Sequence, residues 1–141
     1  MKVIFVGSNP AWASTSSKAF DESTKSGRIL RGWTSHLHGE FLFRYLNVCD
    51  KPTPNNRPLK RSEIKENLPQ LTKWIEASKF HSTHEIKLVA LGKTAAIALT
   101  LLRLDFYEMP HPSGLNRLLN DPTYVADKIK GLQEYCKPSK D

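Results

Sequence analysis

The sequence predicts an α/β fold, a three-layer α/β/α sandwich around a central, largely parallel sheet of four strands. The alternation of two sequence patterns leads to this prediction. Short apolar runs rich in β-branched residues alternate along the chain with segments whose apolar residues recur at helical spacing. Strands that are separated by helices pair in parallel, and the helices then cover both faces of the sheet. The 141 residues contain no internal repeat and no linker-like shift in composition, so we expect a single domain over residues 1–141.

The first half of the chain is expected to hold two strands and two helices. Residues 2–6 form a β-branched and aromatic run that stops at Gly7, which predicts a buried strand. Helical spacing then predicts a helix that carries Ile29, Leu30, Trp33 and Leu37. A second strand is expected over residues 41–48, closed by an irregular Pro- and Asn-rich stretch. A longer amphipathic helix follows, with a kink or a split at Pro69, and its apolar residues are Ile64, Leu68, Leu71, Trp74 and Ile75.

The second half repeats the alternation. A strand is expected over residues 86–91, because the run ends at Gly92 and an Ala-rich helical segment follows at 94–102. A fourth, short strand is expected at 106–109, before a loop. Asp121 and Pro122 have the side chains typical of an N-cap and a first helical position, so they predict a last helix that runs to about Tyr135.

The chain is basic, with 21 Lys and Arg residues, 14 Asp and Glu residues and a formal net charge of +7. A charge of this sign attracts polyanions, so nucleic acid is the first partner to consider. The excess is concentrated between residues 51 and 73, where six basic residues stand against two acidic ones. That window is either a surface for a polyanion or a solvated loop and helix face.

Composition also argues against several classes of protein. Only Cys49 and Cys136 occur, without a Cys-x-x-Cys motif, so we expect no disulfide framework, no metal site and no cofactor. Apolar runs such as residues 95–99 are far shorter than the roughly 20 residues of a membrane helix, so no membrane partner is expected. The apolar run at residues 3–6 is too short for a secretory signal. We therefore expect a protein that is not secreted and is cytoplasmic, or nuclear in a eukaryote.

Three unusual loops follow predicted strands, at residues 7–11, 47–58 and 110–117. In a parallel sheet the carboxyl ends of the strands share one edge, and ligands bind in the crevice outside that edge. We therefore expect these loops to converge on the functional site.

Three side chains in or near these loops are candidates for ligand contacts. Asn9 can bind a water or a polar group of a substrate, or it can close an Asx-type turn on its own backbone. Asn47 can read the edge of a heterocycle such as a pyrimidine, or it can cap the end of its strand. Phe20 can stack on a base or seal the core.

The loop at residues 110–117 combines an imidazole, a hydroxyl and a guanidinium on a backbone that two prolines stiffen. His111 can hydrogen-bond to an anionic leaving group, and Ser113 and Arg117 can hold phosphates. Leu115 is either a small core anchor or a wedge that fills a gap in a base stack.

Two motifs resemble the signature motifs of the uracil-DNA glycosylase superfamily. They are Gly7-Ser8-Asn9-Pro10-Ala11, after the first strand, and His111-Pro112-Ser113-Gly114-Leu115-Asn116-Arg117, late in the chain. Residues 46–58 are similar to its segment with an Asn-Val start and an Asn-Arg-bearing continuation, and residues 89–95 are similar to its later strand-to-helix junction. The four similarities occur in the superfamily's order and cover most of the chain.

The resemblance implies a role for each matching residue. Asn9 would orient the hydrolytic water, and His111 would hydrogen-bond to O2 of the departing base as negative charge develops there. Asn47 would read the Watson–Crick edge of the base, and Phe20 would stack on it. Further substrate contacts would come from Gly7, Ser8 and Pro10. Contacts with DNA would come from Arg57, Lys93, Ser113, Gly114, Leu115, Asn116 and Arg117, with Leu115 filling the gap that the flipped nucleotide leaves.

The resemblance therefore predicts a monofunctional DNA glycosylase of base excision repair type, acting as a monomer. It would flip uracil or a related pyrimidine out of single- or double-stranded DNA and hydrolyse the N-glycosidic bond, leaving an abasic site. Superfamily branches with a similar middle segment carry four cysteines for an iron–sulfur cluster, which this chain lacks, so no cluster is expected. Ala11 stands where the most uracil-selective branch has a Tyr that excludes the thymine methyl group. The alternatives are a non-catalytic DNA-binding module of the same fold and a glycosylase for a bulkier C5-modified pyrimidine.

Overall fold

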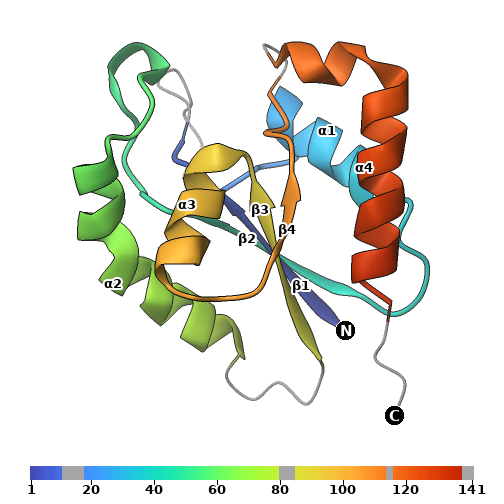
Figure 1. The fold of residues 1–141 in the computed structure, drawn as a ribbon, viewed down its shortest axis with the longest axis horizontal. Helices are drawn as coiled ribbons and strands as arrows, with labels where there is room; N and C mark the ends of the chain where they lie inside the picture. The colour runs from blue at the N-terminus through green and yellow to red at the C-terminus, as the bar shows by residue number, and fades with distance from the viewer. Residues whose placement is uncertain (11–17, 80–84, 114–115, 138–141) are drawn as a thin grey trace.

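The computed structural model describes residues 1–10, 18–79, 85–113 and 116–137, and its centre is a sheet of four parallel strands (Figure 1). The sheet has the order β2-β1-β3-β4. Its strands are Lys2–Gly7 (β1), Leu42–Asn47 (β2), Ile86–Leu91 (β3) and Tyr107–Met109 (β4). The four predicted strands and their parallel direction are confirmed. The chain places β2 on one side of β1 and β3 on the other, so the topology switches direction at β1.

Helices cover both faces of the sheet (Figure 1). Lys25–Thr34 (α1) and Pro122–Tyr135 (α4) pack on one face, and Arg61–Lys79 (α2) and Lys93–Leu101 (α3) pack on the other. This arrangement confirms the predicted three-layer sandwich. The last helix begins where the sequence predicts, because the Asp121 carboxylate accepts hydrogen bonds from two backbone N–H groups of its first turn.

Strand β1 contributes to the core on both sides of the sheet. All six of its residues are buried, and their side chains alternate between the two faces. Val3 and Phe5 join a cluster with α1 and α4, whereas Ile4 and Val6 join a second cluster with α2 and α3. A strand with both faces covered needs apolar side chains at successive positions, which explains the continuous apolar run at residues 3–6.

Two helix predictions need correction. Of the kink or split predicted at Pro69, the split is wrong, since the helix runs through this residue. Pro69 and Lys65 are both exposed, so the carbonyl that the proline leaves without an N–H partner lies on the solvent side of the helix. Helix α1 ends at Thr34, and Leu37 reaches its core cluster from the loop beyond.

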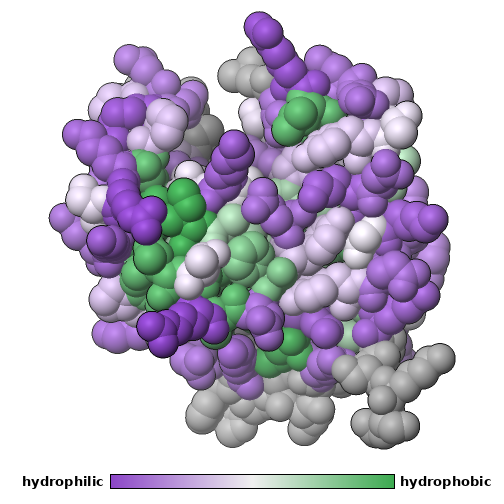
Figure 2. All heavy atoms as spheres, viewed as in Figure 1, coloured by the Kyte–Doolittle hydropathy of each residue, from purple (hydrophilic) through white to green (hydrophobic). Residues whose placement is uncertain are grey.

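The surface seen in Figure 2 is mostly hydrophilic, and its broadest apolar patch lies over α3. There the exposed Ile97 lines a shallow hollow of about 320 Å³ together with Ala96, Leu101 and Phe106. Within the described ranges, no helix combines the length and the apolar character that crossing a bilayer requires.

The packing of α4 predicts the effect of one core substitution. Leu132 is completely buried between α4 and the sheet. Leu132→Ala should lower the free energy of unfolding by about 2–5 kcal/mol, because it removes buried methyl groups and leaves a cavity. Chemical denaturation measures this change. The control is Lys130→Ala on the exposed side of the same helix, which should shift the free energy by less than about 0.5 kcal/mol; equal losses in the two variants would contradict this packing.

Candidate active site

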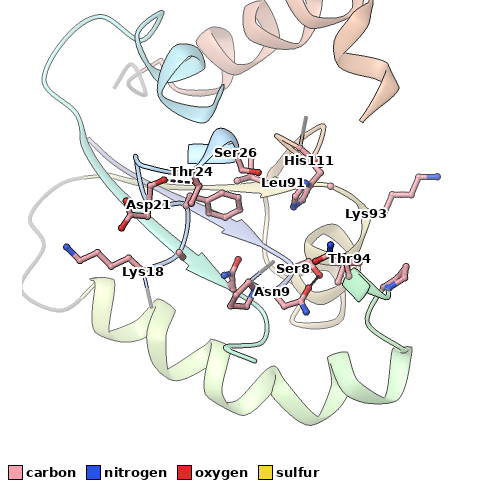
Figure 3. A pocket seen from close by; sticks show the side chains of 18 of the residues that line it. Ser8, Asn9, Lys18, Asp21, Thr24, Ser26, Leu91, Lys93, Thr94 and His111 are labelled. Atoms are coloured by element: carbon pink, nitrogen blue, oxygen red, sulfur yellow. Dashed lines mark hydrogen bonds between the residues drawn. The ribbon is translucent and has the colours of Figure 1, made fainter. Parts of the chain in front are cut away.

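A cleft of about 880 Å³ lies at the carboxyl ends of the strands (Figure 3). Strands β1 and β2 end at Gly7 and Asn47, and the residues that follow β3 and β4 reach the same cleft. The loops therefore converge as the parallel sheet predicts, and residues 18–26, before and within α1, supply one more wall. The predicted site residues that line the cleft are Ser8, Asn9, Pro10, Phe20, Asn47, Arg57, Lys93, His111 and Ser113.

Asn9 is held by its amide nitrogen. Nδ2 donates to the backbone carbonyl of Lys51 at 3.2 Å and to Oγ1 of Thr53 at 3.4 Å. Thr53 is buried and donates in turn to the backbone carbonyl of Arg57. The Asn9 Oδ1 accepts a hydrogen bond from Ser8 Oγ at 3.0 Å and has capacity for a second one. This orientation suits a group that positions a water without deprotonating it.

Asn47 presents a buried oxygen to the cleft. The residue is 9% exposed, and its Oδ1 finds no hydrogen-bond donor in the described part of the chain. Such an atom costs free energy unless a ligand or a water pairs with it. Its approach to β1 depends on Gly7, since a Cβ at that position would lie 2.8 Å from Oδ1. The site thus offers an acceptor to an N–H or O–H group of a ligand.

Phe20 brings an aromatic ring between Gly7 and His111. A Cβ on Gly7 would lie only 2.3 Å from Cζ of Phe20, so the glycine makes room for the ring. The centroids of the Phe20 and His111 rings are 6.2 Å apart, and the rings are tilted by 53°. The Phe20 ring is half-buried and lines the cleft, which makes it available to a planar ligand.

His111 packs against Gly92, at the start of α3. The backbone of Gly92 has a φ of +92°, and a Cβ there would lie 3.1 Å from Cβ of His111, so the position favours glycine. Burial lowers the pKa of His111 below its ordinary value of 6.5, because removal from water disfavours the imidazolium. The imidazole is therefore neutral at pH 7, with one N–H donor.

The loop after His111 is stabilised from within. Asn116 Nδ2 donates to the backbone carbonyl of His111 at 3.0 Å, and Asn116 Oδ1 accepts from the backbone N–H of Leu118 at 3.1 Å. These bonds lead the chain into the short 3-10 helix Arg117–Asn120. The amide of Asn116 is thus already used inside the loop, and its contact with DNA stays a prediction. Gly114 and Leu115 lie outside the described residues.

The predicted phosphate-binding cations have different surroundings. Arg57 forms a two-point ion pair with Glu63, at 2.8 Å and 3.1 Å, and this contact lowers the pKa of Glu63 to about 2. Lys93 and Arg117 are exposed, and Figure 3 shows the Lys93 side chain extending outward from α3. Within the described ranges, no three His, Cys, Asp or Glu side chains lie close enough together to hold a metal ion.

The sequence profile of the uracil DNA glycosylase superfamily matches residues 1–133. The chain belongs to the uracil DNA glycosylase superfamily. The match includes all four strands and every described residue that lines the cleft. A comparison with curated proteins gives no match.

Two parts of this cleft were not predicted from the sequence. Thr53 holds the Asn9 amide, although 44 positions separate the two residues. The wall at residues 18–26 also carries polar side chains beside Phe20, and they are Lys18, Asp21, Ser23, Thr24 and Ser26. Thr24 gave a local signal, since its side chain caps α1 by accepting from the N–H of Gly27 at 3.0 Å. No local signal indicates the contact of Thr53, which depends on tertiary packing.

The burial of His111 predicts its titration. In an NMR titration of the imidazole C–H signals, His111 should show a pKa below 6.5. The unfolded chain binds this proton more readily, so the free energy of unfolding should fall as the pH drops from 6.5 through the folded-state pKa. The His111 signals are identified by their loss in His111→Gln. A pKa at or above 6.5 would contradict a neutral imidazole in the cleft.

Proposed function

We propose that this protein is a monofunctional DNA glycosylase that hydrolyses the N-glycosidic bond of uracil, or of a related pyrimidine, and leaves an abasic site. The observation that carries the proposal is the meeting of Phe20, Asn47 and His111 in one cleft, together with the Asn9 carbonyl. Membership of the uracil DNA glycosylase superfamily supports the same class of reaction.

Recognition of the base rests on Phe20 and Asn47. A flipped pyrimidine stacks on the Phe20 ring, which every base can do because every base has a π-face. The buried Asn47 Oδ1 accepts a hydrogen bond from N3–H of uracil, and the amide nitrogen can donate to O4. The two contacts together select a planar ring with a donor and an acceptor side by side.

Cleavage of the bond rests on His111 and Asn9. As the bond from N1 to C1′ breaks, its electron pair moves to the base, and the neutral His111 imidazole donates a hydrogen bond to O2, where negative charge develops. The Asn9 Oδ1 positions a water that adds to the oxocarbenium-like C1′. An amide is a weak base, so departure of the base precedes attack by water. After the addition the oxygen bound to C1′ releases one proton, which neutralises the departed base anion.

Binding of DNA rests on the positive charge of the chain and on its exposed cations. The formal net charge is +7, and Lys93 and Arg117 are exposed in segments next to His111. Ser113 lines the cleft itself. These groups suit the phosphates on either side of a flipped nucleotide.

Ala11, which would bear on the discrimination against C5 substituents, lies outside the described residues, so the preferred base is left to the assay.

The first test compares excision by the wild type with excision by Asn9→Ala and His111→Ala. End-labelled single- and double-stranded oligonucleotides carry one uracil, thymine or 5-hydroxymethyluracil, and alkali reveals abasic sites. Each variant should lose about 10²–10³-fold in rate, because each removes a group that acts in the transition state. His38→Ala, an exposed histidine in the loop that precedes β2, is the control and should excise at the wild-type rate.

Two results would contradict the proposal. Unchanged excision by the folded Asn9 and His111 variants would remove these residues from the mechanism. Failure of the wild type to excise any of the three bases, with tight and salt-sensitive DNA binding, would instead favour a non-catalytic binding module.

A second test concerns the hydroxyl of Thr53. Thr53→Val removes one of the two acceptors of Asn9 Nδ2 and leaves only the Lys51 carbonyl, so the amide is fixed less firmly and the water is held less well. The kcat for uracil excision should fall by about tenfold, the equivalent of one hydrogen bond, with KM little changed. Thr53→Ser keeps the hydroxyl and should retain most of the activity. An equal fall in kcat for both variants would contradict this role of the hydroxyl, because Thr53→Ser retains it, and would point to the packing of the Thr53 side chain instead.

A further inference from the structure

The backbone of Phe20 has a conformation that side chains other than glycine rarely adopt. Its φ is +52°, in the left-handed region. A residue persists in this region only where its surroundings over-determine it, and such residues are concentrated at functional sites. The conformation directs the Phe20 ring over Gly7 and toward His111. The contacts that impose this turn therefore decide where the ring stands in the cleft.

Gly27 is the first of these contacts. It lies in the first turns of α1 and is buried, and a Cβ at this position would be 2.0 Å from the carbonyl oxygen of Asp21 and 2.7 Å from that of Phe20. Both obstacles are backbone atoms, so no side-chain rotation can relieve the clash. Glycine in a helix interior is unfavourable compared with alanine. Here it lets the backbone of the Phe20 turn lie directly on the helix.

Arg31 is the second contact, one turn further along the same face of α1. Its Nη1 donates to the backbone carbonyl of Phe20 at 2.6 Å and to that of Gly27 at 3.2 Å. The guanidinium is held in place by the Tyr45 ring, whose centroid lies 4.6 Å from Cζ. The carbonyl of Asp21, next in the turn, accepts from the backbone N–H of Thr24 at 2.9 Å.

We propose that Gly27 and Arg31 are positioning residues that fix the left-handed turn at Phe20 and so set the stacking ring over the cleft before any ligand arrives. The use of the ring for stacking on a base rests on the proposed function. The placement of the ring by α1 does not, so the two can be tested apart. Neither Gly27 nor Arg31 touches the base in this scheme, because both act through Phe20.

The test compares two glycine-to-alanine substitutions on the same helix. Gly27→Ala should push the turn away from α1, whereas Gly32→Ala meets nothing within 4 Å and is the matched control. The first readout needs no activity: the ring C–H signals of His111, recorded by NMR at pH 8, sense the ring current of Phe20. They should move in Gly27→Ala and stay in place in Gly32→Ala. Unmoved signals in a folded Gly27→Ala would overturn the proposal.

The second readout is kcat/KM for excision of uracil. Gly27→Ala should lower it by about tenfold, as expected for lost stacking on one base. In a Phe20→Ala background the same substitution should cost nothing, because a residue that acts through Phe20 has no further effect once the ring is gone. An equal cost in both backgrounds would overturn the proposal. Absence of excision by the wild type would refute the proposed function and leave the NMR comparison decisive for the positioning role.

If Gly27→Ala does not fold, two arginine variants test the same proposal. Arg31→Met removes the hydrogen bond to the Phe20 carbonyl. Arg28→Met is the control. Arg28 is exposed on the same helix, and its Nη1 donates to the Ser23 carbonyl at 3.0 Å and not to that of Phe20. The His111 signals should move in Arg31→Met and remain in Arg28→Met. The same shift in both variants, or in neither, would refute the role of Arg31.

Discussion

The fold and its cleft depend on the burial of β1 at the centre of a parallel sheet. This strand pairs with β2 on one side and with β3 on the other, and helices cover both of its faces. Its apolar side chains fill the core on both sides of the sheet, so a shift in its register would disrupt the packing of both core clusters. Because its neighbours run in the same direction, the loops that follow them are brought to one edge, where the candidate active site lies.

Glycines allow the site to be compact. The absence of a side chain at Gly7 leaves room for Phe20 and Asn47. In the same way, Gly92 leaves room for His111, and Gly27 leaves room for the turn that carries Phe20. In each case the space of a missing side chain is filled by a group from another segment of the chain. The cleft is thus assembled from close backbone approaches as well as from the side chains that line it, and a substitution at one of these glycines would displace those side chains.

Local rules predicted the elements well and the contacts between them only in part. The strand at residues 86–91 and the cap at Asp121 follow from patterns within a few residues, and both are confirmed. The passage of α2 through Pro69 depends on the solvent exposure of Pro69 and of the Lys65 carbonyl, which becomes evident only in the folded chain. The partners of Thr53 and Arg31 were equally hidden, because each contact joins residues that are adjacent only in the folded chain. The motifs located Asn9, Asn47 and His111 in the cleft, but the use of Asn116 inside its own loop required the coordinates.

The buried oxygen of Asn47, which has no hydrogen-bond donor among the described residues, would let the proposed pocket reject ligands without a steric clash. A ligand that turns an N–H toward this oxygen relieves the energetic penalty of a buried carbonyl. A ligand that turns a lone pair or a methyl group toward it leaves the penalty in place and adds the loss of its own hydration. The strength of this discrimination depends on the free-energy cost of the unmade hydrogen bond and not on the size of the ligand. It can therefore be far stronger than discrimination by the shape of the pocket. A roomy cleft is therefore compatible with a selective one.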